Sequence, residues 1–288
     1  MAKGMRDIKR QIKSIQNTKQ ITKAMEMIAA ARLKRAQDAA QSARPYAEKL
    51  REVIGAIASA GGANHPMLEK RPIKRTGYIV ITSDRGLAGG YNANLLRKVM
   101  LTIREKHKSN ADEYMIFAIG RKGRDFLRRR GVALAYEKTG LADFPRFSDI
   151  KEVAAGAVKA YEEGTIDELV LVYNEFQSAI SQRPVDKVLL PLGETASGKA
   201  GATATYEFEP SPDVVLSHIL PRYAETLVYS AVLEGKASEF GARMTAMSSA
   251  TKNATKFINS LTLQYNRARQ ASITQEITEI VAGANAQS

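Results

Sequence analysis

The chain lacks several features that would mark common classes of protein. None of its 288 residues is cysteine, which excludes a disulfide framework and thiolate chemistry and fits a reducing compartment. No window approaches eighteen consecutive apolar residues, so the sequence predicts no membrane-spanning helix. The N-terminus, MAKGMRDIKRQIK, has no apolar core of the length found in signal peptides.

Proline and glycine are scarce near the C-terminus. No proline follows Pro221, and glycine occurs after it only at positions 235, 241 and 283. Small or apolar side chains recur there at steps of three and four residues, the spacing of a coiled-coil seam. They are Leu216, Leu220, Tyr223, Leu227, Met244, Met247, Thr251, Ala254, Ile258, Leu261, Tyr265 and Ala268. The spacing predicts one helix over residues 212–283, roughly 105 Å long at 1.5 Å per residue.

The first sixty residues supply a partner for this helix. An apolar stripe on helical spacing runs through Ile8, Ile12, Ile15, Ile21, Met25 and Ile28, then through Ala36, Ala40, Ala43, Ala47, Leu50, Ile54 and Ile57. It predicts a helix over residues 5–58, bent at Pro45 and stopped by Gly61-Gly62. We expect the two long helices to pair as an antiparallel coiled coil. The alternative is that each is an ordinary bundle helix.

Between the two long helices the spacing of apolar residues changes, from the helical steps of three and four to short apolar runs. Apolar runs predict strands over residues 77–82, 113–119, 132–136, 168–173 and 185–192, the last two paired. Helices are predicted over residues 92–108, 122–130 and 149–163, the last with a capping box from Asp149 and Glu152, and a loop over residues 193–203. The fold class is therefore α/β with a long antiparallel coiled coil: residues 1–60 and 210–288 form a shaft, and residues 75–204 form an inserted open α/β, Rossmann-like domain.

Few residues could carry chemistry. The segment Ser83–Asn92 follows a predicted strand and opens a helix, where α/β folds bind phosphate. It lacks both common phosphate-binding glycine patterns, and its glycines fit a tight turn equally well. The segment Gly120–Gly123 could likewise hold an anion or simply form a turn after a strand. The histidines at positions 65, 107 and 218 have no ligand spacing, so no metal site is predicted.

The charge of the chain points to an acidic partner or surface. The formal net charge is +13, and residues 1–58 alone carry 13 Lys+Arg against 5 Asp+Glu. The run Arg128–Arg130 is one helical turn without the interleaved aromatic residues that stack on bases. We therefore interpret it as a solvated helix end, so this run gives no reason to expect nucleic-acid binding.

Three segments resemble one family. Residues 15–30 (IQNTKQITKAMEMIAA) are similar to the N-terminal signature of the gamma subunit of F-type ATP synthases. Residues 83–92 (SDRGLAGGYN) resemble the central turn of that family, and residues 261–281 (LTLQYNRARQASITQEITEIV) resemble its C-terminal signature. The three segments lie in the expected order, and the resemblance covers essentially the whole chain.

The resemblance implies a non-catalytic rotor shaft without a cofactor or metal of its own. One copy would insert into the ring of alpha and beta subunits and stand on the membrane c-ring with epsilon, coupling proton-driven rotation to ATP synthesis. The start at Met1-Ala2, without a transit peptide, favours a bacterial protein at the cytoplasmic side of the cell inner membrane.

The resemblance also implies contact residues. Met25 would lie near the acidic lever loop of the beta subunit, and Arg269, Gln270 and Thr274 would form a catch on the C-terminal helix. Further basic residues would meet acidic stator loops; they are Lys19, Lys23, Arg32, Lys34 and Arg35. From the residues alone, Met25 could equally pack in the seam and Arg269 could belong to a solvated face.

Two other classes of function stay open at this point. The chain could be a nucleotide-binding α/β enzyme with coiled-coil arms, in which case the isolated chain should bind ATP at Ser83–Asn92 with micromolar affinity. It could also be a coiled coil associated with nucleic acid, in which case its affinity should fall steeply with salt.

Overall fold

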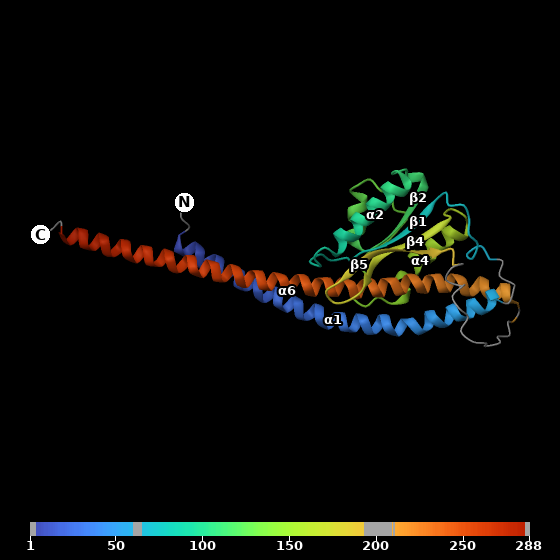
Figure 1. Cartoon of the computed structure of the whole chain (residues 1–288), viewed down its shortest axis with the longest axis horizontal. Helices are drawn as coiled ribbons and strands as arrows, with labels where there is room; N and C mark the ends of the chain where they lie inside the picture. The colour runs from blue at the N-terminus through green and yellow to red at the C-terminus, as the bar shows by residue number, and fades with distance from the viewer. Residues whose placement is uncertain (1–3, 60–64, 193–208, 210, 286–288) are drawn as a thin grey trace. The chain divides into compact units, whose positions relative to one another are not determined.

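The computed structural model describes residues 4–59, 65–192, 209 and 211–285 (Figure 1). The chain forms two compact units. Met1–Ile28 with Met244–Ser288 is called the helix-pair unit below, and Ala29–Arg243 is called the sheet unit. The boundaries predicted for the shaft and the inserted domain stay a prediction, because the sheet unit holds parts of both.

Two long helices lie at the ends of the chain, as predicted. Helix α1 is Met5–Ser59 and helix α6 is Pro212–Asn285. Pro45 lies inside α1 and Pro221 inside α6, and neither ends its helix. A proline removes one backbone donor, but α1 keeps half-buried alanines on both sides of Pro45, so packing continues across it. The predicted stop at Gly61-Gly62 lies outside the described residues.

The sheet unit contains one five-stranded sheet with the strand order β3-β2-β1-β4-β5. Its strands are β1 (Thr76–Ile81), β2 (Tyr114–Ile119), β3 (Tyr136–Lys138), β4 (Glu168–Phe176) and β5 (Gln182–Leu190). The first four are parallel, and β5 pairs antiparallel with β4. The predicted open α/β sheet and the predicted pairing of its last two strands are confirmed.

Helices cover both faces of this sheet (Figure 1). They are α2 (Tyr91–His107), α3 (Arg121–Arg128) and α4 (Phe147–Glu162), with a short 3-10 turn, η1, at Ala111–Glu113. Alternate residues of a strand point to opposite faces. Tyr78 and Val80 accordingly pack with α2 and α3, and Ile79 and Ile81 pack with α4, α6 and the end of α1.

Two local predictions were wrong. The third strand was predicted over residues 132–136, but Gly131 has a φ of +72° and regular pairing with β2 begins only at Tyr136, after a single backbone bond from the N–H of Ala135 to the carbonyl of Ile116 at 2.9 Å. Strand β3 is therefore Tyr136–Lys138. The capping box was predicted to start at Asp149. Helix α4 begins earlier, at Phe147, and the Asp149 carboxylate accepts from the backbone N–H of Arg146 at 2.8 Å. The predicted loop over residues 193–203 lies outside the described residues.

The seam of α1 also differs from the prediction. Ile21 and Ile28 were assigned to it, yet their side chains are 60% and 50% exposed. One series of residues that are at least half-buried follows steps of three and four: Ile8, Ile12, Ile15, Lys19, Thr22, Glu26, Ala29, Leu33 and Ala36. Beside this series, Gln11, Met25 and Arg32 are also half-buried. Polar side chains therefore carry part of the seam. The predicted seam of α6 after Met244 is confirmed, since all its members are at least half-buried.

The helix-pair unit consists of the first part of α1 and the last part of α6, which run antiparallel (Figure 1). Thr22 and Thr251 face each other, with their Oγ1 atoms 2.8 Å apart. Among the described residues of this unit, the buried side chains are those of Ile8, Thr22, Met247 and Ala254. From Ile273 to Asn285 every residue of α6 is exposed.

Candidate partner interface

The segment Ser83–Asn92, the candidate nucleotide loop, connects β1 to α2. The backbone N–H of Ser83 donates to Asn92 Oδ1 at 3.0 Å, and Asn92 Nδ2 donates to Ser83 Oγ at 2.8 Å. The Ser83 hydroxyl in turn donates to the carbonyl of Arg85 at 2.7 Å. The two ends of the turn are therefore tied to each other by their own polar side chains.

Asp84 occupies the N-terminus of α3, which begins within the second candidate anion-binding segment, Gly120–Gly123. Its carboxylate accepts from the backbone N–H groups of Arg121, Gly140 and Leu141, each at 2.9 Å. Arg121 is the first residue of α3, and a helix N-terminus attracts negative charge. The chain thus neutralises this helix end with its own carboxylate. No single motif signals this arrangement, because it joins three separate segments.

Three of the predicted contact residues lie in the sheet unit, and each has an internal partner. Arg32 forms an ion pair with Asp143 at 2.7 Å, and Lys34 forms one with Asp38 at 2.9 Å. The guanidinium of Arg35 lies 4.3 Å from the centre of the Phe144 ring. These pairs are partly exposed, and exposed pairs contribute little to stability. The three side chains can therefore exchange their internal partners for an acidic partner at low cost.

Met25, Lys19 and Lys23 lie on α1 in the helix-pair unit. Met25 and Lys19 are half-buried, and Lys23 is exposed and forms an ion pair with Glu26 at 3.3 Å. Met25 is therefore neither a fully packed seam residue nor a fully exposed one. Its neighbours Ile21, Met27 and Ile28 are exposed by half or more, which makes this stretch of α1 unusually apolar for a surface.

Arg269, Gln270 and Thr274 are all exposed on α6. Thr251 lies opposite Thr22, and Arg269 follows Thr251 by 18 residues, about 27 Å along a helix. The structure therefore does not bring Met25 together with Arg269. If both bind partners, they form two separate contacts at different heights on the helix pair.

Exposed apolar side chains on both helices are a further feature of the helix-pair unit. Besides those on α1, the large ones on α6 are Phe257, Leu263, Ile273, Ile277, Ile280 and Val281, each about half exposed or more. The signal was present in the sequence, since these positions fall outside the three–four steps of the seam. Contiguous exposed apolar surface marks interaction sites.

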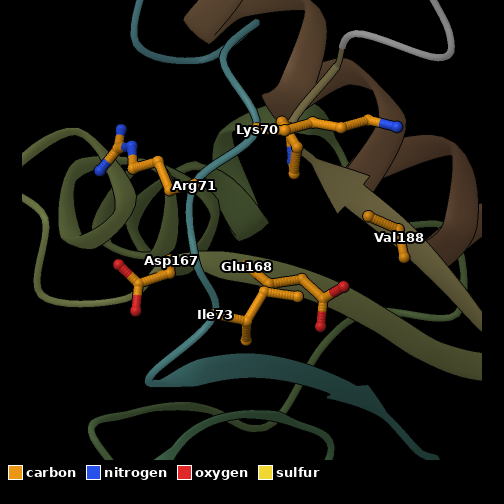
Figure 2. Close-up of a pocket in the computed structure, with 7 residues that line it drawn as sticks. Lys70, Arg71, Ile73, Asp167, Glu168 and Val188 are labelled. Atoms are coloured by element: carbon orange, nitrogen blue, oxygen red, sulfur yellow. The ribbon is translucent and has the colours of Figure 1, made fainter.

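A cavity of about 620 Å³ lies in the sheet unit where β1 and β4 begin (Figure 2). Its lining residues are Lys70, Arg71, Ile73, Asp167, Glu168, Val188 and Pro191. The Arg71 guanidinium donates to the carbonyls of Tyr161 and Pro66, and Asp167 accepts from the backbone N–H groups of residues 74 and 75. Ile73 and Val188 are 59% and 56% exposed.

This cavity suits a protein partner better than a reacting substrate. Open α/β sheets bind small ligands at the carboxyl ends of their strands, and this cavity lies at the opposite edge. Arg71 and Asp167 already hold the surrounding loops in place. The exposed apolar walls can accept a partner side chain.

Comparisons with known proteins cover the whole chain. The family model described as ATP synthase matches residues 4–287. The ATP synthase gamma chain of Brevibacillus brevis is 65% identical over 288 residues, which is all of both chains. Among the described residues, no helix is both long and apolar enough to cross a membrane.

Solved structures share the fold. A chain of the Tetrahymena thermophila mitochondrial ATP synthase central stalk and c-ring matches with a TM-score of 0.60 and 26% identity, covering 80% of this chain and 99% of that one. A chain of the Euglena gracilis mitochondrial ATP synthase matches with a TM-score of 0.68 and 18% identity, covering 98% of this chain and 94% of that one.

Proposed function

The chain belongs to the ATP synthase gamma family, and from that membership we propose that it is the central rotor shaft of a proton-driven F-type ATP synthase. In this role it couples rotation of the c-ring to ATP synthesis at catalytic sites of the alpha and beta subunits, and it holds no catalytic residue itself. One copy serves each complex. The complex places it at the cytoplasmic side of the cell inner membrane as a peripheral protein.

The observation that carries this proposal is the exposed apolar surface of the helix-pair unit. An isolated pair of helices that leaves Phe257 62% exposed and Ile280 71% exposed lacks part of the cover it needs. Burying apolar surface contributes about 25 cal/mol per Å². A surrounding ring of subunits supplies that burial along the whole length of the pair.

The predicted contact residues fit two levels of such a ring. Lys19, Lys23 and Met25 combine positive charge with an apolar neighbourhood, which suits an acidic and partly apolar loop of the beta subunit. Arg269, Gln270 and Thr274 lie near the end of α6. From Arg269 to Asn285 every residue except Ser272 is exposed. They can make the polar contacts that depend on the rotation angle.

The sheet unit offers a different surface to the base of the complex. The cavity beside Ile73 and Val188 is open, and β5 is an edge strand whose outer residues Asp186–Val188 are exposed. We assign this surface to the epsilon subunit and the c-ring. The internally paired basic residues Arg32, Lys34 and Arg35 remain available to acidic stator loops.

Rotation can drive synthesis only if the shaft contacts its surroundings unequally. A ligand shifts a conformational equilibrium only by its difference in affinity for the two states. The helix pair is asymmetric in cross-section, with apolar residues on some faces and charged residues on others. Identical beta subunits therefore meet different surfaces at one moment, and each meets all of them in turn.

The test is to isolate the chain from detergent-solubilised membranes and identify what accompanies it. We expect alpha, beta, epsilon and c subunits, with one copy of this chain for each alpha–beta hexamer. Recovery of the chain without these subunits would refute the proposal. Titration of the isolated chain with ATP should show no saturable micromolar binding, because Ser83 and Asn92 bond to each other and Asp84 occupies the N-terminus of α3. Such binding would support the enzyme alternative.

A further inference from the structure

Part of α6 is buried on all its sides. Every residue from Gly235 to Gly241 is buried, including charged Lys236 and Glu239 at 7% and 4% exposure. A surface helix normally turns a polar face to water. This segment lies against the sheet unit's own strands β4 and β5 (Figure 1), and its polar groups find their partners there.

A chain of buried hydrogen bonds crosses from the sheet to this segment. Asn174, on β4, donates through Nδ2 to the carbonyl of Tyr91 at 3.1 Å, and the Tyr91 hydroxyl donates to the carbonyl of Gly235 at 2.9 Å. The carbonyl of Asn174 accepts from the Ser238 hydroxyl at 2.8 Å. Strand, turn and helix are thus linked in a closed circuit.

Two charged side chains extend this circuit along α6. Glu234 accepts from the Tyr173 hydroxyl at 3.0 Å and from the backbone N–H of Phe176 at 3.3 Å. Arg243 donates to the carbonyl of Gly86 at 3.1 Å and to Glu239 at 2.8 Å. The contacts therefore cover almost three turns of the helix, from residue 234 to residue 243.

Two glycines allow this close approach. A Cβ added at Gly235 would lie 3.3 Å from Ile81 Cγ2 and 3.4 Å from the Tyr91 hydroxyl. One added at Gly241 would lie 3.1 Å from the carbonyl oxygen of Ala179. Glycine costs about 1 kcal/mol relative to alanine inside a helix. Its presence at both positions is explained by the contact of α6 with the sheet and the β4–β5 connection.

Directional contacts at this place suit a mechanical role. Apolar burial is non-directional, so two packed apolar surfaces resist sliding weakly. Hydrogen bonds weaken steeply when their angles change. These hydrogen bonds are buried away from water, and in the protein interior electrostatic interactions are stronger than they are in water. A force that turns the sheet around the axis of α6 must break or bend all of them together.

We propose that Tyr91, Asn174, Ser238 and Glu234 form a sheet–shaft joint that transmits torque between the inserted sheet and α6. The inference rests on the proposed function as a rotor shaft. It assigns these four as positioning residues, which keep the angle between sheet and helix fixed while torque is applied. It also gives the Ser83–Asn92 turn a role, since Tyr91 and Gly86 belong to it.

The test uses the assembled complex with alpha and beta subunits, with a bead attached to the sheet unit. The chain has no cysteine, so Lys108→Cys on the exposed end of α2 gives one attachment point in it. The combined variant Tyr91→Phe and Ser238→Ala removes two bonds of the joint. We expect bead rotation to continue, with a larger angular variance during each pause than in the parent chain.

The matched control is Tyr78→Phe. Tyr78 is also buried on the sheet, and its hydroxyl lies 2.8 Å from His107 Nε2, on the face covered by α2. This variant loses a hydroxyl of the same kind without touching α6. A general loss of stability would broaden the bead angle in both variants, whereas a joint broadens it only in the Tyr91 and Ser238 variant.

Equal angular variance in the two variants would overturn the joint. If the double variant fails to fold, Glu234→Gln replaces it, because this change keeps the side-chain shape and weakens the bonds to Tyr173 and Phe176. We expect it to increase the angular variance of the bead by itself. An unchanged angular variance in this variant would also overturn the joint. If the parent chain joins no complex or its bead never rotates, the proposed rotor function fails and the joint fails with it.

Discussion

In the sheet unit α6 is buried at every residue from Gly235 to Gly241, whereas in the helix-pair unit the same helix buries only Met247 and Ala254 among its described residues. The first part buries large apolar side chains of its own, such as Phe240, and meets polar partners from the sheet. The second part contacts α1 at the Thr22–Thr251 pair, and from Ile273 to Asn285 all its residues are exposed. One continuous helix thus has two kinds of surroundings.

The difference shows where each part obtains its stability. The sheet unit has a buried apolar cluster on each face of its sheet, although it also exposes apolar side chains such as Ile73, Ile180 and Val188. The helix-pair unit has polar residues in its α1 seam, Lys19, Thr22 and Glu26, and exposes apolar ones, Ile21 and Ile28, on its surface. This arrangement is unfavourable for an isolated pair of helices and favourable for a pair surrounded by other subunits.

The largest expected effect compares two phenylalanines of α6. Phe240 is fully buried and Phe257 is 62% exposed. Truncating a buried phenylalanine removes its burial and leaves a cavity, at a cost of about 3–5 kcal/mol. We expect Phe240→Ala to lower the free energy of unfolding of the isolated chain by that amount, measured by urea denaturation.

Phe257→Ala serves as the matched change in the other unit. Exposed substitutions usually stay within about 0.5 kcal/mol, so we expect this variant to unfold like the parent chain. In the assembled complex it should lose stability, because the side chain is then covered. Equal losses for the two isolated variants would show that the helix-pair unit is as well packed as the sheet unit.

The next effect concerns the exposed polar residues of α6. Replacing Arg269 and Gln270 together by leucine should leave assembly intact, because neither side chain is buried within the chain. If they contact stator subunits, losing a buried charge-assisted contact costs roughly 2–5 kcal/mol. We expect ATP synthesis and hydrolysis in membranes to fall about tenfold or more at matched assembly. Normal rates would remove both residues from the interface.

Most of the fold could be predicted because its signals are local. Runs such as Tyr78–Ile81 and the three–four steps of α6 each lie within one element, and the structure places those elements within a few residues of the predicted bounds. The α1 seam was misplaced because Ile21 and Ile28 are apolar, and apolarity does not distinguish packing within the chain from packing against a partner. Thr22 and Ala29 are the residues that pack within the chain, and both lie at steps of three and four from Ile8 and Ile15.

The site could be predicted only in part, because its geometry is non-local. Asp84 meets Arg121, Gly140 and Leu141, which are 37 to 57 residues away in the sequence. Asn174 and Gly235 meet through Tyr91. No spacing rule joins such positions. The contact residues implied by the resemblance stay predictions, because the structure gives their exposure and internal partners and contains no stator subunit.

A smaller effect is expected at the Thr22–Thr251 pair. Thr22→Val keeps the shape of the side chain and removes its hydroxyl, so the Thr251 hydroxyl keeps its bond to the carbonyl of Met247 and loses its contact with α1. The net value of such a bond is about 0.5–1.5 kcal/mol. We expect faster hydrogen exchange in the helix-pair unit and unchanged exchange in the sheet unit.

Thr18→Val is the control for this change. The Thr18 hydroxyl donates to the carbonyl of Ser14 at 3.1 Å and is exposed, so this variant removes a hydroxyl from the same helix without touching the seam. We expect no change in exchange. Identical exchange in the Thr18 and Thr22 variants would mean that the threonine pair does not hold the two helices together.

The smallest effect is a pH dependence restricted to the sheet unit. All three histidines, at positions 65, 107 and 218, belong to this unit. Burial lowers the pKa of His107 below its usual 6.5, and Glu113 opposes this shift only partly. Tyr78 and Tyr114 also face the imidazole. Burial likewise lowers the pKa of His65.

The direction of the effect follows from the proton balance. Because the folded pKa lies below the unfolded pKa, the unfolded chain binds more protons as the pH falls, and the stability present above pH 6.5 is lost as the pH passes through the folded pKa. Each histidine contributes at most about 1.4 kcal/mol per pH unit.

Between pH 7.5 and 5.5 we expect the sheet unit to lose stability, measured by hydrogen exchange corrected for its intrinsic pH dependence. The helix-pair unit has no histidine, so its corrected exchange should stay constant over this range. His107→Gln should start from a lower stability and show a flatter slope in the sheet unit. An unchanged slope in that variant, or an equal loss of protection in both units, would show that His107 does not set the pH dependence.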